Sequence, residues 1–277
     1  MTTPITNSNG TCAAPERASL PRRSDFLCRW FSWWVRGYLK KHFHAVRLSR
    51  GSRPNVSPDW PLIVVLNHAS WWDPLVGVVL AGQFPERTHY APMDAKALTR
   101  YRLFNKLGFY GVEQGTSRGA FSFLQTTAAI LSQTNSAVWI TGQGQFTDPR
   151  ARPPRLRSGV GHIARRLTRG VILTLALEYP FWDERLPEAL ARFGEPISIE
   201  TGQDLDAAEW VQRIEANLAA AQDALMADAL SRKPSAFETL VKGRVAIGGI
   251  YDRGRRLLAW LGGERFQAEH GSEGGRP

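Results

Sequence analysis

Three short apolar runs, each bounded by polar residues, mark the middle of the chain at 61–66 (PLIVVL), 137–141 (AVWIT) and 171–177 (VILTLAL). Runs of this length and composition are typical of strands that are buried on both faces of a sheet. Between them, residues 74–80 and 119–131 carry apolar side chains at helical spacing. This alternation predicts an α/β sheet whose functional site lies at the strand ends.

Residues 26–43 have an aromatic-rich, basic pattern that differs sharply from the polar sequence before them. On a helix, one face carries Arg29, Ser32, Arg36 and Lys40, and the remaining surface carries Leu27, Trp30, Phe31, Trp33, Trp34, Val35, Tyr38 and Leu39. Basic residues recur too often for a transmembrane span, which needs about 18 or more apolar residues with few charges. We expect a helix in the membrane interface, with its cations at the lipid headgroups. The alternative is a helix that packs on the folded domain through the same aromatic side chains.

The C-terminal part of the chain shows two further amphipathic patterns. Residues 204–230 predict a helix that packs on the core through one apolar stripe, which comprises Leu205, Trp210, Ile214, Leu218, Ala221, Leu225 and Ala229. Lys233 and Pro234 end this helix, because the residue before a proline disfavours helical geometry. Residues 237–260 mix basic with apolar side chains and form a second basic amphipathic candidate, which a central glycine pair weakens.

Composition narrows the classes of partner. The 277 residues make one large domain or two small ones, and 43% hydrophobic with 22% charged residues excludes a chain that is disordered throughout. The net charge of +10 indicates a polyanionic neighbour, which is nucleic acid, an anionic bilayer or a phosphorylated substrate. The 10 tryptophans favour the bilayer, because indole rings prefer the membrane interface. Cys12 and Cys28 are too few for a disulfide framework, so we expect free thiols in a reducing compartment.

These patterns divide the chain into one α/β domain with helical flanks. The expected units are a disordered lead at 1–24, an amphipathic membrane-associating helix at 25–50, a catalytic domain at 51–202, a helical C-terminal extension at 203–262 and a flexible tail at 263–277.

The strongest local signal for chemistry is the segment NHASWWDP at 67–74, directly after the first buried strand. His68 ends the strand, and Asp73 before Pro74 is typical of a helix N-cap. Across the intervening turn the carboxylate can hold one imidazole nitrogen protonated and leave the other free as a base. Ser70 lacks the Gly-x-Ser-x-Gly elbow of a nucleophile, so we interpret it as a turn or capping hydroxyl.

This segment resembles the His-x4-Asp motif of the glycerolipid (lysophospholipid) acyltransferase family. Later segments resemble further blocks in the family's order: 107–112 (LGFYGV), 138–148 (VWITGQGQFTD), 157–164 (RSGVGHIA) and 173–180 (LTLALEYP). The resemblance covers about residues 60–200. It implies the family's fold, a mixed and mostly parallel sheet flanked by helices.

The resemblance also implies an activity, that of an O-acyltransferase similar to 1-acylglycerol-3-phosphate acyltransferases. His68 is then the general base that takes the proton of an acceptor hydroxyl, and Asp73 orients it. The third block, with Gly142, Gln143 and Gly144, contacts the acceptor. The donor is acyl-CoA or acyl carrier protein, the acceptor is a lysolipid, and neither a metal nor another cofactor is implied.

Several positions depart from the family pattern. The glutamate of the third block is Gln143 here, and its arginine is Phe146. Arg118 is the nearest counterpart of the second block's arginine, and Arg150 and Arg157 are candidates for phosphate or donor contacts. Lysophosphatidate remains the acceptor that the family implies, while a less charged hydroxyl, as in a glycolipid, a carotenoid glycoside or a lyso-aminolipid, stays open.

Two other classes of function remain as alternatives. One is a non-catalytic, basic membrane- or lipid-binding protein on the same scaffold, and the other is an acyl hydrolase in which water replaces the acceptor. Nucleic-acid binding is disfavoured, because the aromatic residues share helical stripes near the N-terminus rather than one basic groove. We expect a peripheral or monotopic protein on the cytoplasmic face of a membrane.

Overall fold

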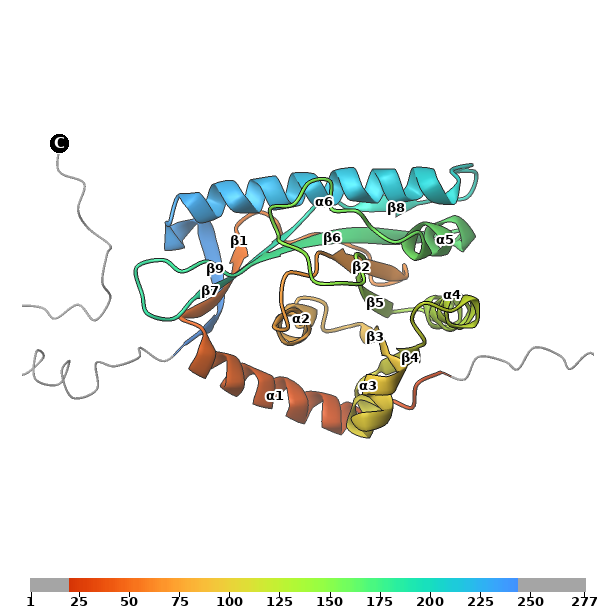
Figure 1. Cartoon of the computed structure of the whole chain (residues 1–277), viewed down its shortest axis with the longest axis horizontal. Helices are drawn as coiled ribbons and strands as arrows, with labels where there is room; N and C mark the ends of the chain where they lie inside the picture. The colour runs from red at the N-terminus through yellow and green to blue at the C-terminus, as the bar shows by residue number, and fades with distance from the viewer. Residues whose placement is uncertain (1–19, 244–277) are drawn as a thin grey trace, which may run out of the picture.

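The computed structural model describes residues 20–243 (Figure 1). Most of the lead expected at 1–24 lies outside the described residues, as do the tail at 263–277 and the part of the second basic segment after residue 243.

A nine-stranded sheet forms the centre of the described chain, in the order β4-β3-β5-β2-β6-β7-β1-β9, with β8 also paired to β6. The strands are β1 (Ala45–Ser49), β2 (Leu62–Leu66), β3 (Thr88–Asp94), β4 (Phe109–Val112), β5 (Ser136–Thr141), β6 (Gly170–Glu178), β7 (Glu188–Phe193), β8 (Ile197–Ile199) and β9 (Phe237–Lys242). From β4 to β6 all neighbours are parallel. Strand β7 runs antiparallel to β6, and β9 runs antiparallel to β1. The expected mixed, mostly parallel sheet is confirmed.

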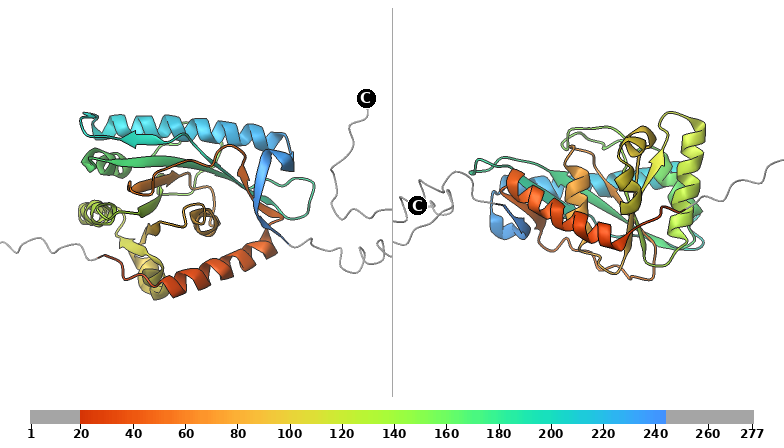
Figure 2. Two further views of the ribbon diagram at one scale, coloured as in Figure 1. Left: turned by 180° about the vertical axis from the view of Figure 1, so that it is seen from behind. Right: turned by 90° about the horizontal axis from the view of Figure 1, so that it is seen from below.

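Helices cover both faces of this sheet, as Figures 1 and 2 show. They are α1 (Asp25–His42), α2 (Asp73–Ala81), α3 (Ala95–Arg100), α4 (Ser117–Leu131), α5 (Gly159–Arg166) and α6 (Ala207–Leu230), with the 3-10 turns η1 (Arg102–Leu107) and η2 (Pro234–Ala236). Strand β2 explains the layering, because its side chains alternate between two cores. Leu62, Val64 and Leu66 pack in the core that includes α1 and α2. Ile63 and Val65 pack in the core that includes α4, α5 and α6.

The three apolar runs of the sequence become β2, β5 and β6, which are adjacent central strands. Their continuous apolar character follows from burial under helices on both faces. Helix α6 buries the predicted stripe from Trp210 to Ala229. It begins at a capping box, in which the Asp206 side chain accepts from the Glu209 backbone while the Glu209 carboxylate accepts from the Asp206 backbone.

Two expectations about the ends of the fold are wrong. The N-terminal helix does not reach residue 50, because it ends at His42 and the chain enters the sheet as β1, which pairs with β7. Residues 237–242 are not helical, because they form β9 against β1. In both cases the segment forms a strand because it pairs with segments far away in the sequence. Local sequence patterns do not show such pairing.

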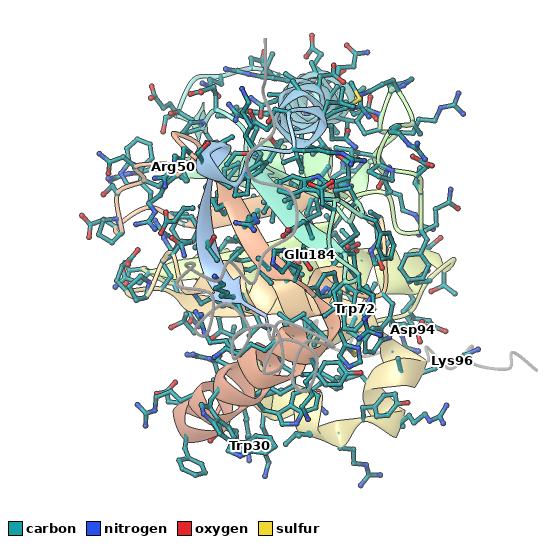
Figure 3. All side chains as sticks on the ribbon, turned by 90° about the vertical axis from the view of Figure 1, so that its left-hand side faces the viewer. Trp30, Arg50, Trp72, Asp94, Lys96 and Glu184 are labelled. Atoms are coloured by element: carbon teal, nitrogen blue, oxygen red, sulfur yellow. The ribbon has the colours of Figure 1, made fainter. Side chains whose placement is uncertain are left out.

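Helix α1 divides its large side chains between the core and the surface. Phe31, Val35 and Leu39 are buried. Trp33 is 72% exposed and Trp30 is 46% exposed, and Figure 3 shows Trp30 on the side of α1 that faces away from the sheet. The helix therefore packs on the domain and still presents aromatic surface. Within residues 20–243, no helix is long and apolar enough to span a bilayer.

Candidate active site

The turn between β2 and α2 brings His68 and Asp73 together. Strand β2 ends at Leu66, and the buried Asn67 joins the strand end to β6 by exchanging hydrogen bonds of 3.0 and 2.7 Å with the backbone of Leu177. The chain then passes His68 and turns into α2. His68 Nδ1 lies 2.7 Å from Asp73 Oδ2, so the hydrogen bond that the spacing predicts is present.

Asp73 is fully buried, and three donors surround its carboxylate. Besides His68, the backbone N–H of Ser70 donates to Oδ2 at 3.0 Å, and the Tyr179 hydroxyl donates to Oδ1 at 2.7 Å. Asp73 is the first residue of α2 rather than its N-cap, a position that Trp72 occupies without a side-chain hydrogen bond. The expected capping role is wrong, because the carboxylate turns toward His68 instead of the helix N-terminus.

Tyr179 comes from the end of β6, the strand next to β2, and the sequence pattern does not single it out. Burial raises the pKa of its phenol well above the usual 10, and the charge of Asp73 and its hydrogen bond act in the same direction. The hydroxyl therefore stays protonated and donates to Asp73 at physiological pH. The signal that the sequence does contain is its place near the end of the third apolar run, from which only Glu178 separates it.

His68 and Asp73 lie in the wall of a cavity of about 780 Å³. Because Nδ1 is bonded to Asp73, Nε2 is the nitrogen of His68 that remains to accept a proton. Beyond the pair, much of the wall is apolar and includes Val78, Ala81, Leu107, Phe109, Phe123 and Leu124. Residues at the start of α2, α4 and α5 also contribute. The cavity thus lies at the carboxyl ends of the parallel strands, where sheets of this class bind ligands.

His89 is a second histidine in the cavity wall, and both of its ring nitrogens are engaged. Trp139 Nε1 donates to Nδ1 at 3.0 Å, so Nε2 carries the proton and donates to the Phe84 carbonyl at 3.0 Å. Burial lowers the pKa of His89 to about 4. The ring is therefore neutral at physiological pH, and it serves as a structural bridge between β3 and β5.

Gln143 lies beside the His68 backbone and is not part of the cavity wall. Its buried side chain accepts from the His68 backbone N–H at 2.7 Å and donates to the Pro154 carbonyl at 2.8 Å. Thr147 N–H adds a hydrogen bond of 2.8 Å to the His68 carbonyl. The structure therefore places Gln143 as a clamp that joins the His68 turn to the loop after β5.

The two glycines that flank Gln143 do line the cavity. A Cβ atom on Gly142 would come 2.7 Å from Leu156 Cδ2 and 3.0 Å from Val65 Cγ1. Gly144 has a φ of +65°, and the Arg157 side chain lies directly against it. Glycine is needed at the first position for close packing and at the second for the backbone conformation.

The predicted arginines separate into two groups. Arg157 lines the cavity, with Nη2 3.4 Å from the Gly144 carbonyl. Arg150 is exposed and forms an ion pair with Asp148 at 2.9 Å. Arg118 is exposed on the first turn of α4, and neither it nor Arg150 is part of the cavity wall. Within the described part of the chain, no group of three or more His, Cys, Asp or Glu side chains is placed to hold a metal ion.

Comparison with known proteins gives a similarity of structure. No protein-family model matches the chain, and no curated protein matches it. Among solved structures, the crystal structure of the 1-acyl-sn-glycerophosphate (LPA) acyltransferase PlsC from Thermotoga maritima is similar, with a TM-score of 0.47 and 14% sequence identity over 72% of this chain and 78% of that chain.

Proposed function

We propose that this protein is an O-acyltransferase that moves a fatty acyl group from a thioester, acyl-CoA or acyl carrier protein, to a hydroxyl of a lysophospholipid or related lipid. The observation that carries the proposal is the 2.7 Å hydrogen bond between His68 Nδ1 and the buried Asp73, with His68 in the wall of a large cavity. The ordered segments that resemble the glycerolipid acyltransferase blocks support the same reaction.

In this reaction His68 acts first as a base and then as an acid. Nε2 takes the proton of the acceptor hydroxyl as the hydroxyl oxygen forms a bond to the thioester carbonyl carbon. When the tetrahedral intermediate collapses, the carbon–sulfur bond breaks and the imidazolium returns the proton to the thiolate. The products are an ester and a free thiol. Such a group contributes about 10²–10⁴-fold, so positioning of both substrates supplies much of the remaining rate.

Asp73 and Tyr179 support this cycle without reacting. The carboxylate fixes the tautomer that leaves Nε2 unprotonated, and it stabilises the imidazolium that forms during transfer. The tyrosine hydroxyl and the Ser70 backbone N–H satisfy the buried carboxylate, because an unpaired charge at this depth is costly.

The environment of Ser70 favours a substrate hydroxyl as the nucleophile over a protein hydroxyl. The Ser70 backbone N–H faces Asp73, and its Oγ accepts a hydrogen bond from the Trp72 backbone N–H at 3.3 Å. This geometry is that of a turn hydroxyl, as the sequence predicts.

We further propose that helix α1 holds the protein at an anionic membrane surface. Its exposed aromatic side chains lie among the cations Arg29, Arg36, Lys40 and Lys41. The neighbouring segment at the start of η1 extends this surface with the exposed side chains of Tyr101 and Leu103. Aromatic and basic side chains on one face suit the interface between headgroups and acyl chains.

The test of the reaction is a His68→Ala variant assayed with an acyl thioester and a lysolipid. We expect acyl transfer to fall by about 10²–10⁴-fold, while circular dichroism and thermal unfolding stay close to those of the unchanged protein. Ser70→Ala should lose less than about threefold, since only its backbone contacts Asp73. A fully active His68→Ala protein would refute the base, and free fatty acid released without an acceptor would indicate a hydrolase instead.

A further inference from the structure

Phe146 is a large apolar side chain placed directly against the proposed base. Its ring centroid lies 4.3 Å from that of His68 at an interplanar angle of 42°, and 62% of the residue is exposed. An acceptor hydroxyl must come within hydrogen-bond distance of His68 Nε2 to react. Phe146 lies outside the cavity wall, so a headgroup that reaches His68 from outside the cavity passes beside its ring.

A phosphate group beside this ring would lose part of its hydration, and neither Phe146 nor Gln143 would supply a hydrogen-bond donor in return. Phe146 has no donor to offer. Gln143, in the same loop, has both ends of its amide committed to the His68 backbone and to Pro154. Removing a charged group from water without compensating hydrogen bonds is strongly unfavourable.

The charges of the cavity wall also disfavour a phosphate group. Among its described residues, Arg157 is the only lysine or arginine, and Asp94 and Glu113 contribute carboxylates. Asp73 adds a third carboxylate, which already has His68 and Tyr179 as partners. A phosphomonoester carries close to two negative charges at neutral pH, so it meets more anions than cations along this wall.

We propose that the acceptor is a lipid alcohol whose headgroup carries no phosphate, and that Phe146 sets this preference. The inference rests on the proposed acyl transfer and names the substrate class of the same site. An uncharged headgroup loses little hydration against the ring, and its hydroxyl still reaches His68. Phe146 is thus a specificity-determining residue rather than a catalytic one.

The test compares two acceptors that differ only in the phosphate, 1-oleoylglycerol and 1-oleoylglycerol-3-phosphate. Their dissociation constants are measured with the full chain in nonionic micelles, without an acyl donor, at high salt to screen the basic face of α1. Phe146→Arg places a guanidinium beside His68. Phe181→Arg is the matched control, because Phe181 is 63% exposed, much like Phe146, but lies in the connection between β6 and β7 and, among the described residues, has no ring contact with His68.

We expect the unchanged protein to bind the uncharged acceptor at least about tenfold more tightly. Phe146→Arg should shift the ratio of the two constants by about tenfold toward the phosphate, and Phe181→Arg should leave the ratio unchanged. The inference is overturned by equal or tighter binding of the phosphate acceptor, by binding of neither acceptor, or by an unchanged ratio in Phe146→Arg. Failure of the proposed reaction is distinct, because it leaves the binding ratio as expected while no acyl group is transferred from any thioester.

Discussion

The hydroxyl of Tyr179 donates a hydrogen bond of 2.7 Å to Asp73 Oδ1, the carboxylate oxygen that His68 does not use. The segments that follow two neighbouring parallel strands therefore both contribute hydrogen bonds to one buried carboxylate. Strand β2 delivers the histidine through the turn that follows it, and β6 delivers the tyrosine from its end.

Replacing Tyr179 by phenylalanine tests this support. Tyr179→Phe leaves Oδ1 of the buried Asp73 without its hydrogen-bond donor. The carboxylate then orients the His68 imidazole less firmly. We expect kcat to fall by about tenfold, which corresponds to about 1.4 kcal/mol, with KM changed less than about twofold. Tyr110→Phe is the matched control, because the Tyr110 hydroxyl forms a buried 2.7 Å hydrogen bond with Thr127, away from the pair. Equal losses of kcat in both variants would show that Tyr179 acts only through stability.

The Gln143 side chain accepts one hydrogen bond and donates another, and a single substitution removes the donor. Gln143→Glu keeps an acceptor for the His68 N–H but places a second acceptor against the Pro154 carbonyl. We expect a loss of about 2–4 kcal/mol in the free energy of unfolding at pH 7, measured by denaturant titration. Gln145→Glu, an exposed position in the same loop, should change it by less than about 0.5 kcal/mol. A Gln143→Glu protein as stable as the control would place the side chain elsewhere.

The pair of His44 and Glu188 makes stability depend on pH. A hydrogen bond of 2.6 Å to Glu188 raises the pKa of His44 above the usual 6.5, against the opposing effect of burial. The folded state therefore holds this proton more tightly than the unfolded state. The resulting stability is fully present below about pH 6.5 and is lost as pH rises through the folded-state pKa.

The variant His44→Asn removes this titration. We expect the difference in unfolding free energy between the unchanged protein and His44→Asn to be larger at about pH 6 than at about pH 9, measured by denaturant titration at both values. A difference that stays constant, or that grows toward the higher pH, would contradict the protonated pair.

The exposed aromatic residues of α1 are expected to carry membrane binding. Trp30→Ser with Trp33→Ser removes two exposed indoles and leaves the buried Phe31 in place. Binding to vesicles that contain anionic lipid should weaken by about tenfold or more in a sedimentation assay, and added salt should weaken it in the unchanged protein. The matched control is Phe121→Ser with Phe181→Ser, two exposed aromatics outside α1. Unchanged sedimentation of the double tryptophan variant would exclude α1 as the anchor.

The centre of the fold was predictable from sequence and its edge was not. Strands β2, β5 and β6 are buried on both faces, so nearly every position in them requires an apolar side chain. Each strand is therefore visible in the sequence as a continuous apolar run. Strand β1 contains Arg47, which is 6% exposed and pairs with Glu188 and Thr239. From sequence alone an arginine is expected on the surface. Arg47 can be buried because hydrogen-bond partners from β7 and β9 lie against its guanidinium, and those partners are distant in the sequence.

The candidate site divides in a similar way. His68 and Asp73 lie in the same turn, so their spacing in the sequence is enough to predict the hydrogen bond between them. Tyr179 joins the pair from another strand, and its contribution depends on strand order, which no local pattern specifies. Gln143 lies in a segment whose resemblance implies acceptor contact, but the direction of its side chain depends on Pro154, within the following loop.

Strand β9 also has a consequence for the solubility of shortened chains. It covers the outer edge of β1, and every residue of β1 is buried. A chain that ended before Phe237 would leave the backbone N–H and C=O groups of β1 unpaired along that edge, next to apolar side chains. Uncovered edges of this kind pair with strands of other molecules. We therefore expect such a truncated protein to self-associate and precipitate even though His68, Asp73 and Tyr179 are all retained.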